Sequence, residues 1–165
     1  MKITLIRHAE SIYNEKHLLQ GQIDCELSNK GLNKTKEIAK EFPQDFDICF
    51  CSPLKRTKQT AKILVPNLVL IFDDRLVERG LGDWEDTPIT DEKQFLLSSN
   101  TVPPNGETFE EFYNRLNSFL EMIKQNYYDK KILVITHVGV IYGMHKILGI
   151  KTKAINNLET VTIDY

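Results

Sequence analysis

Short apolar runs recur along the chain, and longer segments of a different pattern separate them. Each run has about the length of one buried strand and is rich in Ile, Leu, Val or Phe. The strand-like segments are residues 2–6 (KITLI), 47–51 (DICFC), 68–72 (LVLIF), 131–135 (KILVI) and 159–164 (ETVTID). Strands that are apolar along most of their length are typical of a sheet covered on both faces.

The segments between the strands have the periodicity of amphipathic helices. Four helices are predicted. The first begins at Ser28, and the second runs from Ser52-Pro53 through about Leu64. The third covers 107–127, and the fourth runs from Val138 to Leu148. Serine caps a helix and proline suits its first turn, which places the second helix start at Ser52-Pro53. The stripe predicted to be buried on the 107–127 helix is Phe109, Phe112, Leu116, Phe119, Leu120 and Ile123.

Residues 79–106 lack a clear period and are predicted to be irregular, because Pro88, Pro103, Pro104 and Gly106 interrupt them. Elsewhere strands alternate with helices. This order predicts the α/β class, as a three-layer αβα sandwich around a mainly parallel sheet. We expect residues 1–165 to form a single domain, since the length suits one core and no linker or repeat interrupts it.

Three predicted strands end in residues that bind and transfer charged groups. The first strand is followed by Arg7 and His8, the second by Ser52 and the helix that carries Arg56, and the 131–135 strand by His137. Ligands of open α/β sheets bind outside the carboxyl ends of the strands. We therefore expect two arginines, two histidines and the amino end of a helix to meet at one edge, where they suit an anion.

This set of residues predicts chemistry on a phosphate. An arginine fork matches phosphate oxygens, and a neutral imidazole can attack phosphorus at neutral pH. Arg7, Arg56 and a protonated His137 would stabilise the equatorial oxygens while His8 attacks. Glu78 is the carboxyl best placed by sequence to protonate the leaving group. No cluster has the spacing of metal ligands, so we expect a reaction without a metal or another cofactor.

Composition narrows the class of partner. The net charge is −2, which argues against a nucleic-acid-binding domain. No apolar run approaches the roughly 18 residues of a membrane span, and the apolar start is too short for an export signal. Cys25, Cys49 and Cys51 lack CxxC spacing and are expected to be reduced. These features predict a cytoplasmic protein whose substrate is a small phosphorylated metabolite or a phosphoprotein.

Several motifs resemble those of the histidine phosphatase superfamily, also called phosphoglycerate mutase-like. They follow one another along this chain in the same order as in the family. They are LIRHAESIYN (5–14) with Gln20-Gly21, Asp24, Leu27-Ser28 and Gly31 after it, CSPLKRTKQTA (51–61), LVERGLGDWE (76–85), Asn105-Gly106-Glu107-Thr108 with Arg115, and VITHVGVIYG (134–143). The resemblance covers nearly the whole chain and implies the phosphoglycerate mutase-like fold.

The resemblance also implies roles for individual residues. His8 matches the nucleophile that becomes phosphohistidine, and Glu78 matches the proton donor to the leaving group. Arg7, Arg56 and His137 match the groups that hold the phosphate. Asn14 matches an auxiliary phosphate contact, and Gln20 with Gly21 falls in the same phosphate- or substrate-binding segment. The chain departs from the family pattern at Ala9, Leu18, Asp86 and Val138.

Other roles for these residues stay open at this point. Arg56 is alternatively a solvated helix charge, Glu78 an ion-pair partner of Arg79 or another arginine, and Asn14 a cap of a helix or turn. Among activities, a metal-independent phosphomonoester hydrolase is preferred. A cofactor-dependent phosphoglycerate mutase, a phosphohistidine-protein phosphatase and a non-catalytic phospho-ligand binding module are the alternatives.

Two features favour the hydrolase over the mutase. Residues 83–106, which are expected to lie over the site, contain five acidic residues and one basic residue, Lys93. The chain is also short compared with mutases of the family. An acidic cover predicts a leaving group that is neutral or basic rather than polyanionic.

Overall fold

The computed structural model describes residues 1–165 and contains one five-stranded sheet, with the strand order β3-β2-β4-β1-β5. The strands are β1 (Lys2–Arg7), β2 (Ile48–Cys51), β3 (Leu70–Phe72), β4 (Ile132–Thr136) and β5 (Thr160–Asp164). The first four are parallel, and the edge strand β5 pairs antiparallel with β1. All five predicted strands are present, so the prediction of a mainly parallel sheet is confirmed.

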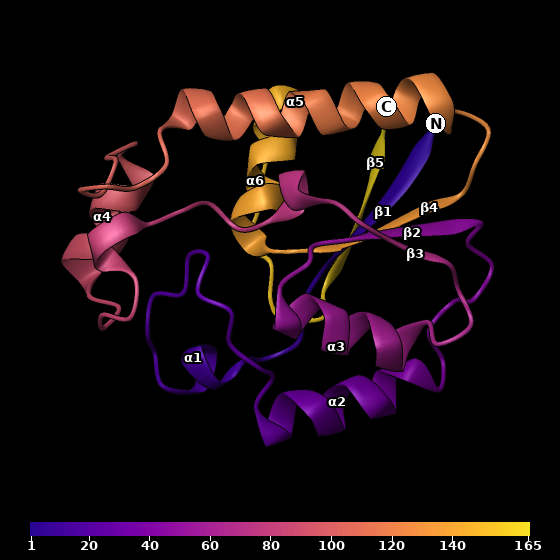
Figure 1. Ribbon diagram of the computed structural model, residues 1–165, viewed down its shortest axis with the longest axis horizontal. Coiled ribbons are helices and arrows are strands. Elements are labelled where there is room, and N and C mark those ends of the chain that lie inside the picture. Colours follow the sequence, from indigo (N-terminus) through magenta and orange to yellow (C-terminus); the bar gives the residue numbers. More distant parts are fainter.

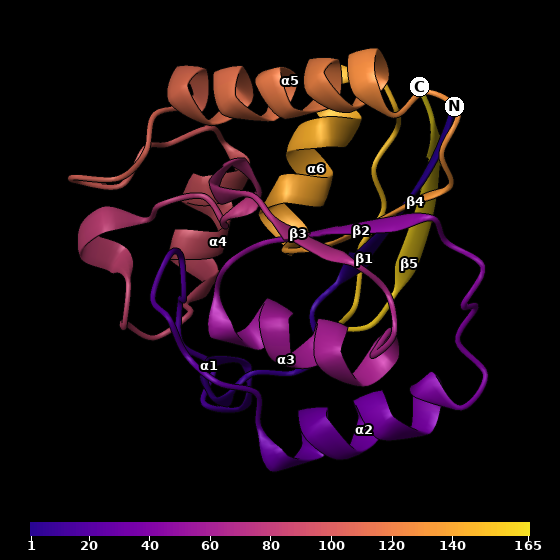
Figure 2. The same cartoon turned by 45° about the vertical axis from the view of Figure 1, so that its right-hand side comes forward.

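Helices cover both faces of this sheet (Figures 1 and 2). On one face lie α2 (Asn29–Ala39) and α3 (Lys55–Leu64). On the other lie α5 (Phe109–Asn126) and α6 (Val138–Ile147). The three-layer αβα architecture is therefore confirmed. None of the helices is long and apolar enough to cross a membrane.

Alternation of side chains along the strands divides the core into two clusters. Ile3 and Leu5 of β1 pack toward α5 and α6, whereas Ile6 packs toward α2 and α3. Strand β4 divides in the same way, with Ile132 and Val134 on the first side and Leu133 and Ile135 on the second. Because β4 lies between β1 and β2 and is buried throughout, it anchors both layers.

The strongest helix prediction agrees closely with α5. Thr108 and Glu111 form a capping box at its start, and five of the six predicted stripe residues are buried: Phe112, Leu116, Phe119, Leu120 and Ile123. Phe109 is only half-buried and does not belong to the core. The buried part of the predicted stripe thus begins at Phe112.

Two local predictions need correction, and one short helix was not predicted. Helix α3 begins at Lys55 with Leu54 as its cap residue, so Ser52 and Pro53 precede it and Ser52 does not cap it. The stretch 79–106 is not entirely irregular, since it contains α4 (Asp91–Ser98) and a 3-10 turn at Gly82–Trp84. A short helix, α1 (Ile12–Glu15), also forms after β1.

The helix in the irregular stretch has clear local causes. The Thr90 hydroxyl accepts a hydrogen bond from the Lys93 amide, and Asp91 and Glu92 place negative charge in the first turn. Pro88 precedes this cap and therefore does not interrupt the helix. Helix α4 has no apolar stripe, and it accordingly buries no residue completely.

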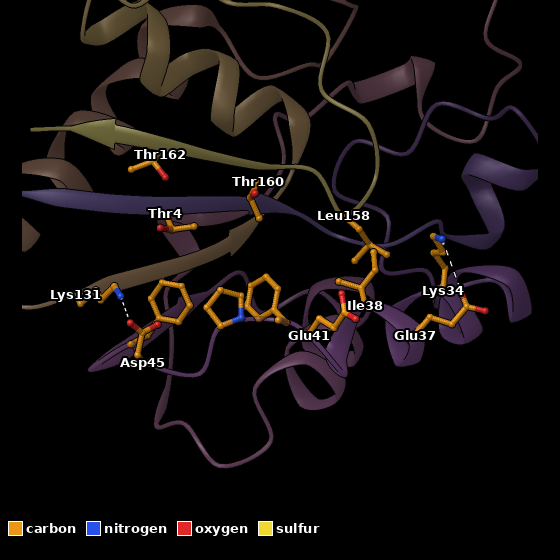
Figure 3. Close-up of a pocket in the computed structure, with 13 residues that line it drawn as sticks. Thr4, Lys34, Glu37, Ile38, Glu41, Asp45, Lys131, Leu158, Thr160 and Thr162 are labelled. Carbon is orange, nitrogen blue, oxygen red and sulfur yellow. Dashed lines mark hydrogen bonds and ion pairs between the residues drawn. The ribbon is translucent and has the colours of Figure 1, made fainter.

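A groove of about 870 Å³ lies between α2 and the edge strand (Figure 3). Figure 3 shows Thr4, Thr160 and Thr162 along its sheet side, and an ion pair between Lys131 and Asp45 at one end. No histidine or arginine lines this groove. It therefore lacks the residues expected for phosphate chemistry.

The start of α2 is packed against the loop that follows β1. The Ser28 hydroxyl donates to the Glu10 carboxylate at 2.7 Å and accepts from the Gly31 amide at 2.9 Å. A Cβ atom on Gly31 would lie 2.0 Å from the backbone oxygen of Glu10. Glycine is therefore required at this close approach.

We expect Gly31→Ala to lower the free energy of unfolding by about 1–3 kcal/mol, the usual range for overpacking, because the Glu10 backbone must move. Urea denaturation followed by circular dichroism measures this change. Asn33→Ala, at an exposed position of the same helix, is the control and should leave stability almost unchanged. Equal stability of the two variants would contradict the packing argument.

Candidate active site

The carboxyl ends of β1, β2 and β4 meet at one edge of the sheet, as predicted. Arg7 of β1 pairs with Thr136 of β4. Immediately beyond, the His8 amide donates to the Thr136 carbonyl at 2.9 Å, and the Ser52 amide donates to the Ile135 carbonyl at 3.0 Å. These backbone bonds continue the ladder for one residue and bring the His8 and His137 rings together, with centroids 5.2 Å apart.

His8 has one ring nitrogen engaged and the other free. Its Nδ1 lies 2.6 Å from the carbonyl oxygen of Ala9, which can only accept, so Nδ1 carries the proton and Nε2 keeps its lone pair. Burial, followed by the charges of Arg56 and Arg7, holds the pKa of His8 well below the usual histidine value. The ring is therefore neutral at pH 7, as a nucleophile requires.

Ala9, a departure from the family pattern, fits this loop without strain. It is not among the residues with positive φ, and its amide donates to the Thr60 hydroxyl at 3.1 Å. Its contribution to His8 comes from the backbone carbonyl. The side chain at this position is therefore free to be a methyl group.

His137 lies behind His8 and is completely buried. Its Nδ1 accepts from Arg56 Nε at 3.3 Å, and its Nε2 lies 2.8 Å from the Ser52 hydroxyl. Because Arg56 can only donate, Nδ1 is unprotonated and Nε2 carries the proton. Burial, then Arg56 and His8, lowers the pKa of His137 well below the usual value. Without a ligand His137 is therefore neutral, and a protonated His137 stays a prediction for the complex with a phosphate.

Arg56 is buried, with only 1% of its surface exposed, so the alternative of a solvated helix charge is wrong. Its terminal nitrogens donate to the carbonyl of Gly21 at 2.8 Å and of Ile23 at 2.6 Å. One guanidinium thus joins α3, His137 and the loop at residues 21–23. This loop is held against the site by that interaction.

Arg7 keeps free donors. Its Nη1 donates to the Ile155 carbonyl at 2.8 Å, whereas its Nε is buried without a hydrogen-bond partner. An unpartnered buried donor costs free energy, which an anionic ligand would recover. This is the one buried side-chain donor of the site that lacks a partner.

The carboxylate of Glu78 accepts two backbone hydrogen bonds, from Arg79 N at 2.8 Å and from Gly139 N at 3.1 Å. A Cβ on Gly139 would lie 2.2 Å from Glu78 Oε1, so glycine permits the approach. The Arg79 guanidinium lies over the Phe109 ring at 3.8 Å and forms no ion pair with Glu78. The ion-pair alternative for Glu78 is therefore wrong.

The segment that contains Glu78 is fixed from behind. Arg115 forms a two-pronged ion pair with Glu107, at 2.6 and 2.9 Å. It also donates to the Glu78 carbonyl at 3.1 Å, and the Gln22 side chain donates to the same oxygen at 3.1 Å. The backbone at residue 78 is thus held from α5 and from the 20–23 loop.

Asn14 has the capping role that was left open for it. Its Oδ1 accepts from the Ser11 amide at 3.0 Å in a capping box at the start of α1. Gln20 Oε1 accepts from the Ser11 hydroxyl at 2.7 Å, and Gly21 has a positive φ of 49°. Both Asn14 and Gln20 face the same cavity as His8.

The amino end of α3 was expected to present free amide groups to an anion. The Lys55 amide instead donates to the Asp24 carboxylate at 2.6 Å. A carboxylate of the chain itself thus occupies this position. The positive groups available to a ligand are the arginines.

One cavity of about 810 Å³ brings the predicted residues together. Arg7, His8, Asn14, Gln20, Gly21, Arg56 and Glu78 line it, whereas His137 lies behind the lining. Sequence reasoning missed the walls that come from α4, α5 and α6. The bulky Val138 directly after His137 was the signal available in the sequence.

Comparison with known proteins agrees with this geometry. A family model described as the histidine phosphatase superfamily (branch 1) matches residues 3–163. Phosphatase PhoE of Bacillus subtilis, itself described as uncharacterized, is 34% identical over 146 residues, covering 86% of this chain and 74% of that protein. Phosphoserine phosphatase 1 of Hydrogenobacter thermophilus is 30% identical over 163 residues, covering 91% of this chain and 77% of that protein.

A solved structure supports the expected fold. The phosphoglycerate mutase of Thermus thermophilus superposes with a TM-score of 0.82 at 24% identity, over 100% of this chain and 94% of that chain. At this identity the likeness concerns the fold alone, and it confirms the phosphoglycerate mutase-like fold. The family match extends over almost the whole chain. This chain therefore belongs to the histidine phosphatase superfamily, branch 1.

Proposed function

We propose that the protein hydrolyses phosphate monoesters through a phosphohistidine on His8. The observation that carries the proposal is the tautomer of His8: a neutral ring whose Nδ1 is bonded to a backbone carbonyl while Nε2 is left to attack. The same cavity contains Arg7, Arg56 and Glu78. A relative named phosphoserine phosphatase 1 agrees with hydrolysis as the reaction.

In the first step, the lone pair of His8 Nε2 forms a bond to phosphorus and the bond from phosphorus to the ester oxygen breaks. Glu78 transfers its carboxyl proton to that oxygen, so the product leaves as a neutral alcohol. The charge that forms on His8 is balanced by the phosphoryl group and by the Ala9 carbonyl.

In the second step, water attacks phosphorus and the bond from phosphorus to Nε2 breaks. The Glu78 carboxylate accepts a proton from the water, inorganic phosphate leaves, and His8 is again neutral. Arg7 and Arg56 stabilise the equatorial oxygens in both steps. A bound dianion also favours protonation of His137, which is neutral without a ligand. No step is assigned to a metal.

We prefer the hydrolase over the mutase alternative for a reason that differs from the one expected. None of the five acidic residues of 83–106 lines the cavity: Glu85, for example, accepts from the Gln22 and Leu81 amides. The acidic cover therefore does not repel an anion directly. The cavity instead offers few cations beyond the phosphate site, which disfavours the second anionic group of a phosphoglycerate or its bisphosphate.

The remaining alternatives predict different outcomes of the experiments below. A non-catalytic phospho-ligand module would bind phosphate without turnover, and a phosphohistidine-protein phosphatase would act on proteins rather than on small esters. We propose a small phosphorylated metabolite as substrate and the cytoplasm as location. The half-enclosed cavity suits a single small molecule better than a protein surface.

We expect His8→Ala to reduce hydrolysis of p-nitrophenyl phosphate by at least about 10³-fold, because the nucleophile is lost. His17→Asn is the matched control, since His17 is exposed and asparagine tolerates its positive φ of 54°. Quenching the wild-type reaction during turnover should trap acid-labile, base-stable phosphate on His8. Equal activity of His8→Ala and wild type would overturn the proposal.

The variant Glu78→Gln separates acid catalysis from binding. We expect kcat/KM for an alkyl phosphate to fall by about 10²–10⁴-fold, because the poor leaving group needs a proton. The loss of kcat/KM for p-nitrophenyl phosphate should be much smaller, since nitrophenolate leaves without one. Comparing kcat/KM of both substrates measures the difference, because kcat also includes the hydrolysis of phosphohistidine, in which Glu78 acts as the base for either substrate. An equal loss for both would assign Glu78 a role other than that of the acid.

The lowered pKa values of His8 and His137 predict a pH dependence of stability. Below about pH 6.5 the unfolded chain binds protons that these buried rings do not, so the free energy of unfolding falls as pH falls. Each histidine contributes a slope of up to about 1.4 kcal/mol per pH unit until its folded-state pKa is reached. Above about pH 7.5 neither contributes a slope.

Urea denaturation of the wild type and of His8→Asn between pH 5.0 and 7.5 tests this slope. The variant should lose the part that belongs to one histidine, because asparagine does not titrate in this range. Identical slopes in the two proteins would show that His8 is not held neutral by the fold.

A further inference from the structure

The cavity that contains His8 has two chemically different parts. The phosphate part is built from residues at the edge of the sheet together with Asn14, Gln20 and Gly21. The other part is built from α4, the start of α5 and the outer face of α6, and Figures 1 and 2 show α4 beyond the edge of the sheet. Because a phosphate held by Arg7 and Arg56 fills the first part, the leaving group must extend into the second.

The leaving-group part is lined mainly by apolar side chains. Eleven of the 26 residues around the whole cavity are hydrophobic, and none of the eleven belongs to the phosphate set. They include Leu18, Leu97, Phe109, Val138 and Tyr142. Apolar walls of this extent favour a ligand with a large apolar surface, because binding removes that surface from water.

This part of the cavity has two cations, Arg79 and Lys146. Arg79 is only 8% exposed, lies over the Phe109 ring and donates to the carbonyls of Glu107 and Thr101, both at 3.3 Å. Lys146 is exposed and lies over the Tyr113 ring at 5.4 Å. A carboxylate or second phosphate on the leaving group would therefore gain one exposed ammonium group in return for the water that it loses, which is poor compensation.

Neutral polar groups are also sparse. Gln94, Ser98 and Asn100 come from α4 and the residue two beyond its end, and Thr152 comes from the loop after α6. Such groups can bind one or two hydroxyls or carbonyls of a ligand. They cannot neutralise a charge.

We propose that the substrate is a phosphate monoester of an uncharged alcohol with a large apolar portion, rather than an amino-acid phosphate, a phosphoglycerate or a sugar bisphosphate. This inference rests on the proposed hydrolase function. The specificity then comes from α4, α5 and α6, and the phosphoryl chemistry comes from the edge of the sheet.

A series of n-alkyl phosphates tests the proposal, because their leaving groups have nearly equal basicity and differ only in apolar length. From ethyl to octyl phosphate, we expect kcat/KM to rise by about two- to fourfold for each methylene until the cavity is filled. Phosphoserine, 3-phosphoglycerate and fructose 1,6-bisphosphate should be hydrolysed at least about tenfold less efficiently than octyl phosphate.

Two variants test the wall itself. Leu18→Arg and Leu97→Arg each add a cation to the apolar part, and Leu97 belongs to a helix without fully buried residues, so its replacement should be tolerated in folding. Each should flatten the dependence of kcat/KM on alkyl length and raise kcat/KM for 3-phosphoglycerate relative to octyl phosphate. Glu41→Ala, in the groove of Figure 3, is the control and should change neither quantity.

The outcomes separate this inference from the proposed function. Absence of turnover on every ester, or turnover that survives His8→Ala, would overturn the hydrolase itself. Turnover that depends on His8 but is independent of alkyl length, or that is fastest with phosphoserine or a bisphosphate, would overturn the apolar leaving group alone. A variant pair that keeps the full length dependence would also overturn it.

Discussion

The hydrogen bonds of the buried Arg56 guanidinium are the interaction on which the rest of the site depends. One guanidinium donates to His137 Nδ1 and to the carbonyls of Gly21 and Ile23. It therefore sets the tautomer of His137 and closes the loop over the site. Its charge also lowers the pKa of both histidines, second only to burial. A lysine could not reproduce this arrangement, because three fixed directions of donation are needed from one planar group.

Two segments distant in sequence are joined around this arginine. The Leu19 amide donates to the Thr87 carbonyl at 2.9 Å, and the Glu85 carboxylate accepts from the Gln22 amide at 2.9 Å. Gly21 permits the approach of Glu85, since a Cβ would lie 2.0 Å from its Oε1. Asp86, where the resemblance would favour glycine, has a positive φ of 60°. The backbone conformation is thus kept although the residue differs, because aspartate tolerates this region better than most residues.

The sequence predicted the elements whose pattern is local and repeated. The β4 run is apolar throughout and α5 has both a capping box and a stripe, so burial and period indicated them directly. The strand-end rule also located Arg7, His8 and His137, because the carboxyl ends of parallel strands lie at the same edge of a sheet. The neutral state of His137 in the ligand-free protein could not be predicted in this way. It depends on a neighbouring arginine from another helix and on complete burial, and both are properties of the folded chain.

The walls of the leaving-group part were missed for a related reason. Phe109 was assigned to the core because its spacing continues the stripe of α5, and only the position of α4 and Arg79 shows that it faces a cavity instead. Likewise, the acidic residues of 83–106 suggested a charged cover, yet none of them lines the cavity. The Glu85 carboxylate accepts from loop amides, and the Asp83 carboxylate accepts from the Asn105 side chain. Net charge of a segment therefore says little about the surface that it presents to a ligand. The chemistry of such a cover depends on which of its side chains face the cavity once the backbone has folded. Here the side chains that face the cavity are mainly apolar.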